Sequence, residues 1–307
     1  MSHEFFLLFF FYSSLNASIE KPYKIKYLDV NILNWQYVPD SSLEVDFRPY
    51  VVVYDINGDG CDDFIAASFR KELDKFSLYA FSGIGYLFWV REYTFNGSDT
   101  FSDLAGSYYT PISSLLIFFA VGKTFFAVFG KNGDVFWSRD VESSNYIPPV
   151  LGDVDGDGVK EVVYVGVDNL YLIEPLSGEI VFNFTVKTWR ATLPVIGDID
   201  GDSRGEIIVI DTDYNVIALN DDGSVLWSRS LNASSNDIPN IRSFLYLMDI
   251  DFDGNLEVVG VVEERRYEDF HEKAYIIFFS IDGVSGNFIV YKRIIKSISR
   301  TVPSPIF

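Results

Sequence analysis

A repeat constrains this 307-residue chain more than any other feature. Four acidic nine-residue segments align with one another, namely 55–63, 153–161, 198–206 and 249–257. Their first residues lie 98, 45 and 51 positions apart, so the first interval spans about two periods. Periods of this size are typical of chains that repeat one supersecondary unit, because a single unit cannot bury its apolar faces alone.

A second motif fixes the period independently. A glycine is followed four residues later by an aromatic residue at 85/89, 133/137, 178/182 and 223/227, in pairs 48, 45 and 45 residues apart. The pair that begins at Gly133 falls between the first two acidic segments, which predicts a repeat that has lost its acidic segment. We expect Trp89, Trp137 and Trp227 to pack between repeats. Arginine follows each tryptophan by two residues, and we expect Arg91, Arg139 and Arg229 to pair with carboxylates on strand surfaces.

Short apolar runs fill the rest of each repeat. Residues 162–165 and 207–210 follow two of the acidic segments, and residues 170–173 and 216–219 come next. Runs of four to six residues rich in Val, Ile, Tyr and Phe, bounded by turn residues, predict β-strands. Four strands in every 40–50 residues predict an all-β fold, a β-propeller of four-stranded antiparallel blades.

The repeats predict one propeller domain over residues 19–307. Five copies are visible, near residues 48–102, 103–146, 147–191, 192–241 and 242–300. Residues 301–307 resemble the start of a further blade, and residues 24–38 could supply its remaining strands. We therefore expect six blades with a composite closing blade, or seven if the chain is a fragment. The charged insertion 263–274, which contains His271, is expected to be a solvated loop.

The N-terminus predicts export. Residues 5–12 are apolar and small residues follow them, so residues 1–18 are typical of a signal peptide, although a buried first strand is the alternative. This run is too short to cross a bilayer, and we expect no stable membrane insertion. Sequons at Asn16, Asn96, Asn183 and Asn232 fit an extracellular glycoprotein.

Charge and composition limit the classes of binding partner and metal site that are expected. The chain has 44 Asp and Glu against 24 Lys and Arg, a formal net charge of −20, which argues against nucleic acid and favours cations. Cys61 is the single cysteine and only two histidines occur, so neither a disulfide framework nor a cysteine- or histidine-based metal site is expected.

The acidic segments predict oxygen-only metal sites. Positions 1, 3 and 5 of each segment are Asp or Asn, position 9 is Asp or Glu, and position 7 would offer its backbone carbonyl. Such donors suit Ca²⁺, which accepts six to eight oxygens, better than Mg²⁺. We therefore expect up to four Ca²⁺ ions. The ligand sets are Asp55, Asn57, Asp59, Cys61 and Asp63; Asp153, Asp155, Asp157, Val159 and Glu161; Asp198, Asp200, Asp202, Arg204 and Glu206; and Asp249, Asp251, Asp253, Asn255 and Glu257.

Two other interpretations of these segments are weaker. An EF-hand needs a glutamate at position 12 and flanking helices, but position 12 here is Ala66, Tyr164, Val209 or Gly260. Solvated turns would explain the Asp, Asn and Gly content without explaining the acid at position 9. Ser203 replaces the position-6 glycine of the third segment, so we expect that segment to have the lowest affinity.

The segment DINGDGCDDFIA at residues 55–66, with its three siblings, resembles the FG-GAP/VCBS repeats of the integrin α-subunit propeller and of related microbial surface proteins. The resemblance spans residues 48 to 300 approximately. It implies an extracellular calcium-binding propeller for adhesion or recognition of a protein or glycan rather than catalysis, with structural Ca²⁺ in hairpin loops of the blades. This chain departs from the family at Ser203, in the second repeat, and in showing five copies where integrins have seven blades.

Enzymatic alternatives stay open at this point. The glycine–tryptophan turns also resemble those of quinoprotein dehydrogenases and of bacterial outer-membrane assembly propellers, but the adjacent cysteine pair of the quinoproteins is missing here. The chain could be a quinoprotein-like propeller without its catalytic residues, or a polysaccharide lyase or hydrolase on the same scaffold. The sequence assigns no catalytic residue.

Overall fold

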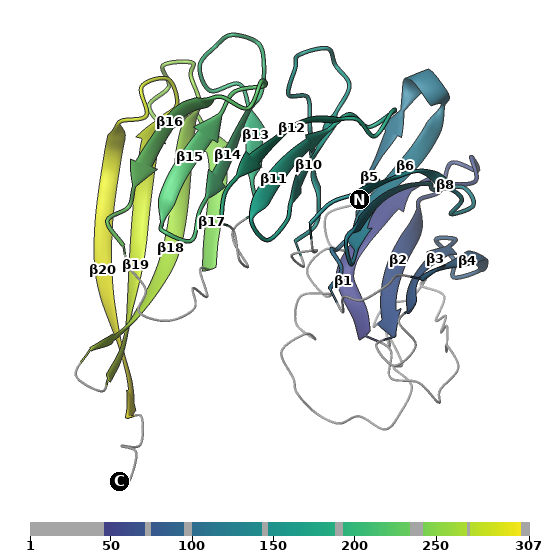
Figure 1. Cartoon of the computed structure of the whole chain (residues 1–307), viewed down its shortest axis with the longest axis horizontal. Helices are drawn as coiled ribbons and strands as arrows, with labels where there is room; N and C mark the ends of the chain where they lie inside the picture. The colour runs from purple at the N-terminus through teal and green to yellow at the C-terminus, as the bar shows by residue number, and fades with distance from the viewer. Residues whose placement is uncertain are drawn as a thin grey trace, which may run out of the picture. The chain divides into compact units, whose positions relative to one another are not determined.

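The computed structural model describes residues 46–70, 75–94, 100–142, 147–187, 193–233, 242–268 and 271–301. Their regular structure is twenty β-strands and a three-residue 3-10 helix, with no α-helix in these ranges. The strands form five four-stranded antiparallel sheets in which chain neighbours pair (Figure 1). The all-β propeller fold predicted from the repeats, with four-stranded antiparallel blades, is confirmed. The chain divides into two compact units, Met1–Arg139 and Asp140–Phe307.

The first unit holds two sheets that share one core. Ile65 and Phe76 of the first sheet pack with Ile117 and Phe119 of the second, and the rings of Phe76 and Phe119 stack at 4.9 Å between centroids. The strands of the first sheet are β1 (Asp46–Tyr54), β2 (Asp63–Arg70), β3 (Lys75–Phe81) and β4 (Leu87–Thr94). Those of the second are β5 (Ala105–Tyr109), β6 (Ser114–Val121), β7 (Thr124–Phe129) and β8 (Val135–Asp140).

The second unit holds three sheets. Their strands are β9 (Val150–Gly152), β10 (Glu161–Val165), β11 (Asn169–Ile173) and β12 (Ile180–Thr185); β13 (Val195–Gly197), β14 (Glu206–Ile210), β15 (Asn215–Leu219) and β16 (Val225–Ser230); and β17 (Arg242–Met248), β18 (Glu257–Glu268), β19 (His271–Asp282) and β20 (Phe288–Thr301). The first strand of the middle sheet, β13, lies against both β9 and β17. Successive sheets of this unit therefore meet along their first strands.

Stacking of the sheets explains why β14 is apolar on both faces. Ile207 and Val209 pack into a core with the third sheet, while Ile208 and Ile210 pack into a core with the fifth. Every residue of β14 is buried. A strand covered on both sides has no solvent face, so its sequence is a continuous β-branched run instead of an alternation.

The aromatic residues of the glycine motif join neighbouring sheets. The indole N–H of Trp227 on β16 donates to the carbonyl of Gly283 in the fifth sheet at 2.6 Å, and a Cβ atom at Gly286 would lie 2.6 Å from the Trp227 ring. Trp89 on β4 donates in the same way to Gly130 of the second sheet at 3.1 Å. Packing between repeats is confirmed for these two tryptophans. Within its own sheet, Trp137 stacks on Phe125 and lies tilted against Phe118.

The arginines that follow the tryptophans do not share one kind of partner. Arg91 pairs with the carboxylate of Asp134 at 3.3 Å, as expected. Arg229 instead donates to the backbone carbonyl of Ser285 at 3.0 Å.

The charged insertion of the fifth repeat is not a loop, so that prediction is wrong. β18 continues to Glu268 and β19 starts at His271, and the two strands pair along their whole length. β20 pairs with β19 over the same stretch, as at Tyr275 and Ile295. Three paired strands satisfy the backbone hydrogen bonds, so charged residues are accommodated on an extended sheet.

The second repeat lacks an acidic loop, as expected. The 3-10 helix η3 (Thr110–Ile112) joins β5 to β6 in its place, and Ser113 closes it with a left-handed φ of 48°. Other predictions fall outside the described residues: the signal peptide over 1–18, the closing-blade strands over 24–38, and residues 302–307. Within the described ranges, no helix has the length and apolar character needed to span a membrane.

Candidate metal centre

Each acidic segment connects the first two strands of a sheet. We name them loop 1 (55–63, before β2), loop 2 (153–161, before β10), loop 3 (198–206, before β14) and loop 4 (249–257, before β18). The last residue of each loop is the first residue of the strand that follows. Strands flank all four loops, which excludes the EF-hand arrangement.

The position-1 aspartate curls each loop around its own carboxylate. In loop 2, Asp153 accepts the N–H groups of Gly156 at 2.9 Å and Gly158 at 3.0 Å, one on each oxygen. Both glycines have left-handed φ values, 80° and 88°, which glycine adopts without steric cost. The position-6 N–H binds the position-1 carboxylate in the other three loops as well. The loops therefore share one backbone design.

The position-9 acid is buried in all four loops. Asp63, Glu161, Glu206 and Glu257 are between 0% and 2% exposed. One oxygen of each accepts the N–H of position 2; in loop 4 this bond joins Ile250 to Glu257 at 2.7 Å. The other oxygen of Glu257 is buried and has no hydrogen-bond partner within the described structure. A buried acceptor without a partner is costly, and a bound cation would remove that cost.

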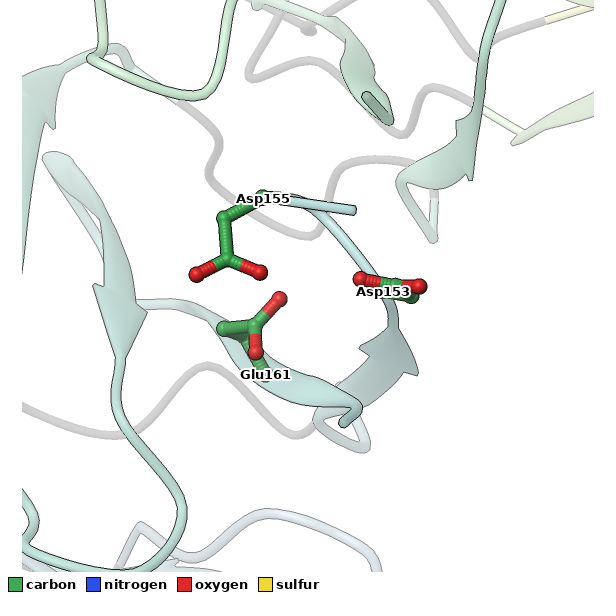
Figure 2. Close-up of side chains that lie close together, drawn as sticks. All are labelled: Asp153, Asp155 and Glu161. Atoms are coloured by element: carbon green, nitrogen blue, oxygen red, sulfur yellow. The ribbon is translucent and has the colours of Figure 1, made fainter. Parts of the chain in front are cut away.

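Three carboxylates converge in loops 2, 3 and 4. In each of these loops one oxygen from positions 1, 3 and 9 lies within 4.8 Å of the other two, in the groups Asp153, Asp155 and Glu161; Asp198, Asp200 and Glu206; and Asp249, Asp251 and Glu257. Figure 2 shows Asp155 and Glu161 pointing toward each other across loop 2, with Asp153 beside them. Oxygen-only donors at this spacing can hold a hard divalent cation.

Loop 1 differs because Asn57 occupies position 3. Its side-chain oxygen accepts the N–H of Asp59 at 2.8 Å and its amide donates to the Asp59 carboxylate at 2.9 Å. Asp55 accepts the N–H of Gly58 and Asp63 accepts the N–H of Ile56, as the equivalent acids do in loops 2 and 3. Loop 1 thus offers one carboxylate fewer at positions 1, 3 and 9.

The position-5 aspartates bind their own loop backbone. Each accepts the N–H of position 7, at 2.7 Å for Asp157 and 2.8 Å for the others. They are not part of the groups of three converging carboxylates. Ligation by Asp59, Asp157, Asp202 and Asp253, and by the carbonyls of Cys61, Val159, Arg204 and Asn255, stays a prediction.

Burial raises the pKa of two position-9 glutamates, Glu161 and Glu206. Desolvation is the main cause that raises the pKa of Glu161 to about 7, opposed by the Val154 N–H and reinforced by the negative charge of Asp155. The pKa of Glu206 is also raised to about 7, by desolvation and by the aspartates of loop 3. A divalent ion beside these carboxylates would favour their charged form.

Two non-glycine residues have the left-handed backbone conformation that glycine adopts at the equivalent positions of the other loops. Ser203 at position 6 of loop 3 has a φ of 73°, which fits the sequence-based expectation of strain there. Phe252 at position 4 of loop 4 has a φ of 63° and is 90% exposed, and sequence reasoning missed it. The signal was available, since position 4 is glycine in the other three loops.

Comparisons with known proteins support the fold and go no further. No protein-family model and no curated protein matches the chain. Among solved structures, the V. cholerae biofilm matrix protein Bap1 matches with a TM-score of 0.54 and 18% identity, over 79% of this chain and 38% of Bap1. The Dos1 propeller matches with a TM-score of 0.47 and 12% identity, over 75% and 57% of the two chains.

A third match is the quinohemoprotein alcohol dehydrogenase ADHIIG of Pseudomonas putida HK5, with a TM-score of 0.43 and 13% identity, over 74% of this chain and 40% of the enzyme. The chain therefore spans less than two thirds of each of these proteins. At such identities the likeness concerns the fold alone.

Proposed function

We propose that this protein is a calcium-binding β-propeller of the FG-GAP/VCBS kind that acts outside the cell as a recognition or adhesion module. The observation that carries the proposal is the convergence of a buried position-9 acid with two aspartates in each of three loops. Up to four Ca²⁺ ions would stabilise the hairpins that begin the blades. In loop 1, Asn57 would replace one carboxylate ligand by an amide oxygen.

The donor chemistry supports calcium over other metals. The converging atoms are carboxylate oxygens, with no imidazole or thiolate among the three converging groups in each of loops 2, 3 and 4. Hard oxygen donors select Ca²⁺, Mg²⁺ or Mn²⁺, and a curled loop with several side-chain and carbonyl oxygens suits the larger, more flexible Ca²⁺ shell. Four bound ions would change the formal net charge from −20 to −12, since each adds two charges.

The proposed role outside the cell rests on the repeat resemblance and on the fold shared with a biofilm matrix protein. Recognition of a protein or glycan requires no catalytic group, and the two carboxylates whose pKa is raised to about 7, Glu161 and Glu206, lie in the metal loops themselves. Desolvation is the main cause of both shifts, so neither glutamate needs a catalytic explanation for its raised pKa.

Thermal unfolding with and without a chelator tests calcium binding. A site saturated at 100 times its Kd adds about 2.7 kcal/mol to the free energy of unfolding, so EDTA should lower the melting temperature strongly and Ca²⁺ should restore it. Glu206→Gln should shrink the calcium-induced shift. Glu179→Gln, which removes the same charge from an exposed turn, should leave it intact. Identical melting curves with EDTA and with Ca²⁺ would contradict the proposal.

A further inference from the structure

Loops 2 and 3 are joined through their backbones. The N–H of Gly205 in loop 3 donates to the carbonyl of Val154 in loop 2 at 2.9 Å. Val154 in turn donates its own N–H to Glu161 at 2.6 Å, and Gly205 directly precedes Glu206. The buried position-9 acids of the two loops are therefore connected by a short path through the backbones of Val154 and Gly205.

The two loops also fit against each other without room for side chains. A Cβ atom at Gly156 of loop 2 would lie 2.5 Å from the carbonyl oxygen of Ser203 in loop 3. A Cβ atom at Gly205 would lie 2.6 Å from the carbonyl oxygen of Asp153. Each loop thus limits the positions open to the backbone of the other.

The contact with Gly156 involves Ser203, the residue of loop 3 that has a left-handed φ. Ser203 must hold a left-handed φ of 73° for its N–H to reach Asp198 at 3.0 Å, and that geometry costs free energy in a non-glycine residue. When loop 2 is ordered, Gly156 packs against the Ser203 carbonyl and restricts the other backbone conformations open to Ser203. Loop 3 is then partly ordered before its own ion binds, so less of the binding free energy is lost to ordering it.

We propose that loops 2 and 3 bind Ca²⁺ as a coupled pair, in which an ion in either loop raises the affinity of the other. This inference rests on the proposed function, because it requires that the loops bind calcium. Loop 1 belongs to the other compact unit, and the repeat that follows it carries η3 in place of an acidic loop. Loop 1 is therefore the natural uncoupled reference.

Hydrogen exchange measured by mass spectrometry during a calcium titration of the full chain tests the coupling. Peptides that cover each loop report the Ca²⁺ concentration at which that loop becomes half protected. Asp155→Asn, which removes a converging carboxylate from loop 2, should raise this midpoint for loop 3 at least fivefold, within the range of measured coupling between sites. Because coupling is reciprocal, Asp200→Asn should raise the loop 2 midpoint by the same factor.

The matched control is Asp55→Asn, which weakens loop 1 and should leave the midpoints of loops 2 and 3 unchanged. Protection of the strand amides of β10 and β14 shows whether each variant is folded. If Asp155→Asn leaves the loop 3 midpoint unchanged while loop 3 still gains protection, the coupling is overturned and the calcium proposal stands. If no loop of the wild-type chain gains protection, the proposed function itself fails, and the coupling with it.

Discussion

Ser203 holds a backbone φ of 73° at a position where the other three loops have glycine. Glycine accepts this conformation without the clash of a Cβ atom, so Ser203→Gly should stabilise calcium-bound loop 3. We expect the free energy of unfolding in Ca²⁺ to rise by about 1 kcal/mol, and the loop 3 affinity to rise with it.

Urea unfolding and calcium titration of the Ser203→Gly variant measure this effect. The control is Ser228→Gly in the middle of β16, where the residue does not have a positive φ and glycine should lower stability by about 0.5–1 kcal/mol. Destabilisation by both substitutions would show that the loop 3 backbone is not strained at Ser203.

The raised pKa values of Glu161 and Glu206 predict an unusual pH dependence for the calcium-free protein. In the folded state each group has a pKa of about 7, against 4.5 for an unperturbed glutamate. The folded state therefore binds more protons than the unfolded state between these values, and its stability falls as pH rises from about 4.5 to about 7. The expected loss is at most about 3 kcal/mol per carboxylate.

Chemical unfolding in EDTA at pH 5 and pH 8 measures this loss. Calcium competes with the protons, so the stabilisation by saturating Ca²⁺ should be larger at pH 8 than at pH 5. The Glu161→Gln/Glu206→Gln double variant should show a flatter profile in EDTA. A calcium-free wild type that is more stable at pH 8 than at pH 5 would show that these glutamates are not buried as described.

At the residue scale the loops were predictable because their chemistry is local. The spacing of positions 1, 3 and 9 places three carboxylates on one curled segment, and the structure brings those side chains together in loops 2 to 4. The left-handed φ of Phe252 was not predicted, because phenylalanine has no local preference for it and only glycine at position 4 of the sibling loops indicates it. Burial of the position-9 acids could not be predicted, since it depends on the stacking of neighbouring sheets.

At the scale of the element, the extended fifth sheet contains a buried ion pair that can be tested. Glu264 on β18 is fully buried, and Arg293 on β20 pairs with its carboxylate while lying 4.2 Å from the Tyr275 ring centre on β19. Arg293→Met should lower the free energy of unfolding by up to about 3–5 kcal/mol, because it removes the guanidinium that pairs with a buried carboxylate.

Urea unfolding of single and double variants isolates the pair. Glu264→Leu/Arg293→Met should recover most of the stability lost in the single variant. Lys75→Met is the control, because Lys75 and Glu92 form a more exposed pair that should contribute less than about 1 kcal/mol. Equal losses of unfolding free energy in Arg293→Met and Lys75→Met would show that the burial of Glu264 does not strengthen its ion pair.

Short apolar strands were predictable, and the charged hairpin was not. Residues 162–165 and 207–210 fall within β10 and β14 as expected, because β-branched runs between turn residues have few other structures open to them. Residues 263–274 are rich in charge, and local composition indicates a loop. Pairing of β18 and β19 with a third strand, β20, is a long-range effect that composition does not report.

At the scale of the whole molecule, a net charge of −20 predicts a salt dependence that calcium should reduce. Without metal, repulsion among the acidic loops opposes folding, and added NaCl screens it, with a Debye length of about 10 Å at 0.1 M. The melting temperature in EDTA should therefore rise between 0.05 and 0.5 M NaCl. In saturating Ca²⁺ the rise should be smaller, and equal slopes in the two conditions would contradict charge neutralisation in the loops.

The 3-10 turn of the second sheet shows that a blade can be assembled without an acidic segment. Thr110–Ile112 joins β5 to β6, and the four strands of that sheet still form in full. The same short connection could be transplanted into the sibling hairpins by protein engineering. Such a redesigned scaffold should keep its blades in media stripped of divalent metals, so the proposed ion requirement would be a removable property of the architecture.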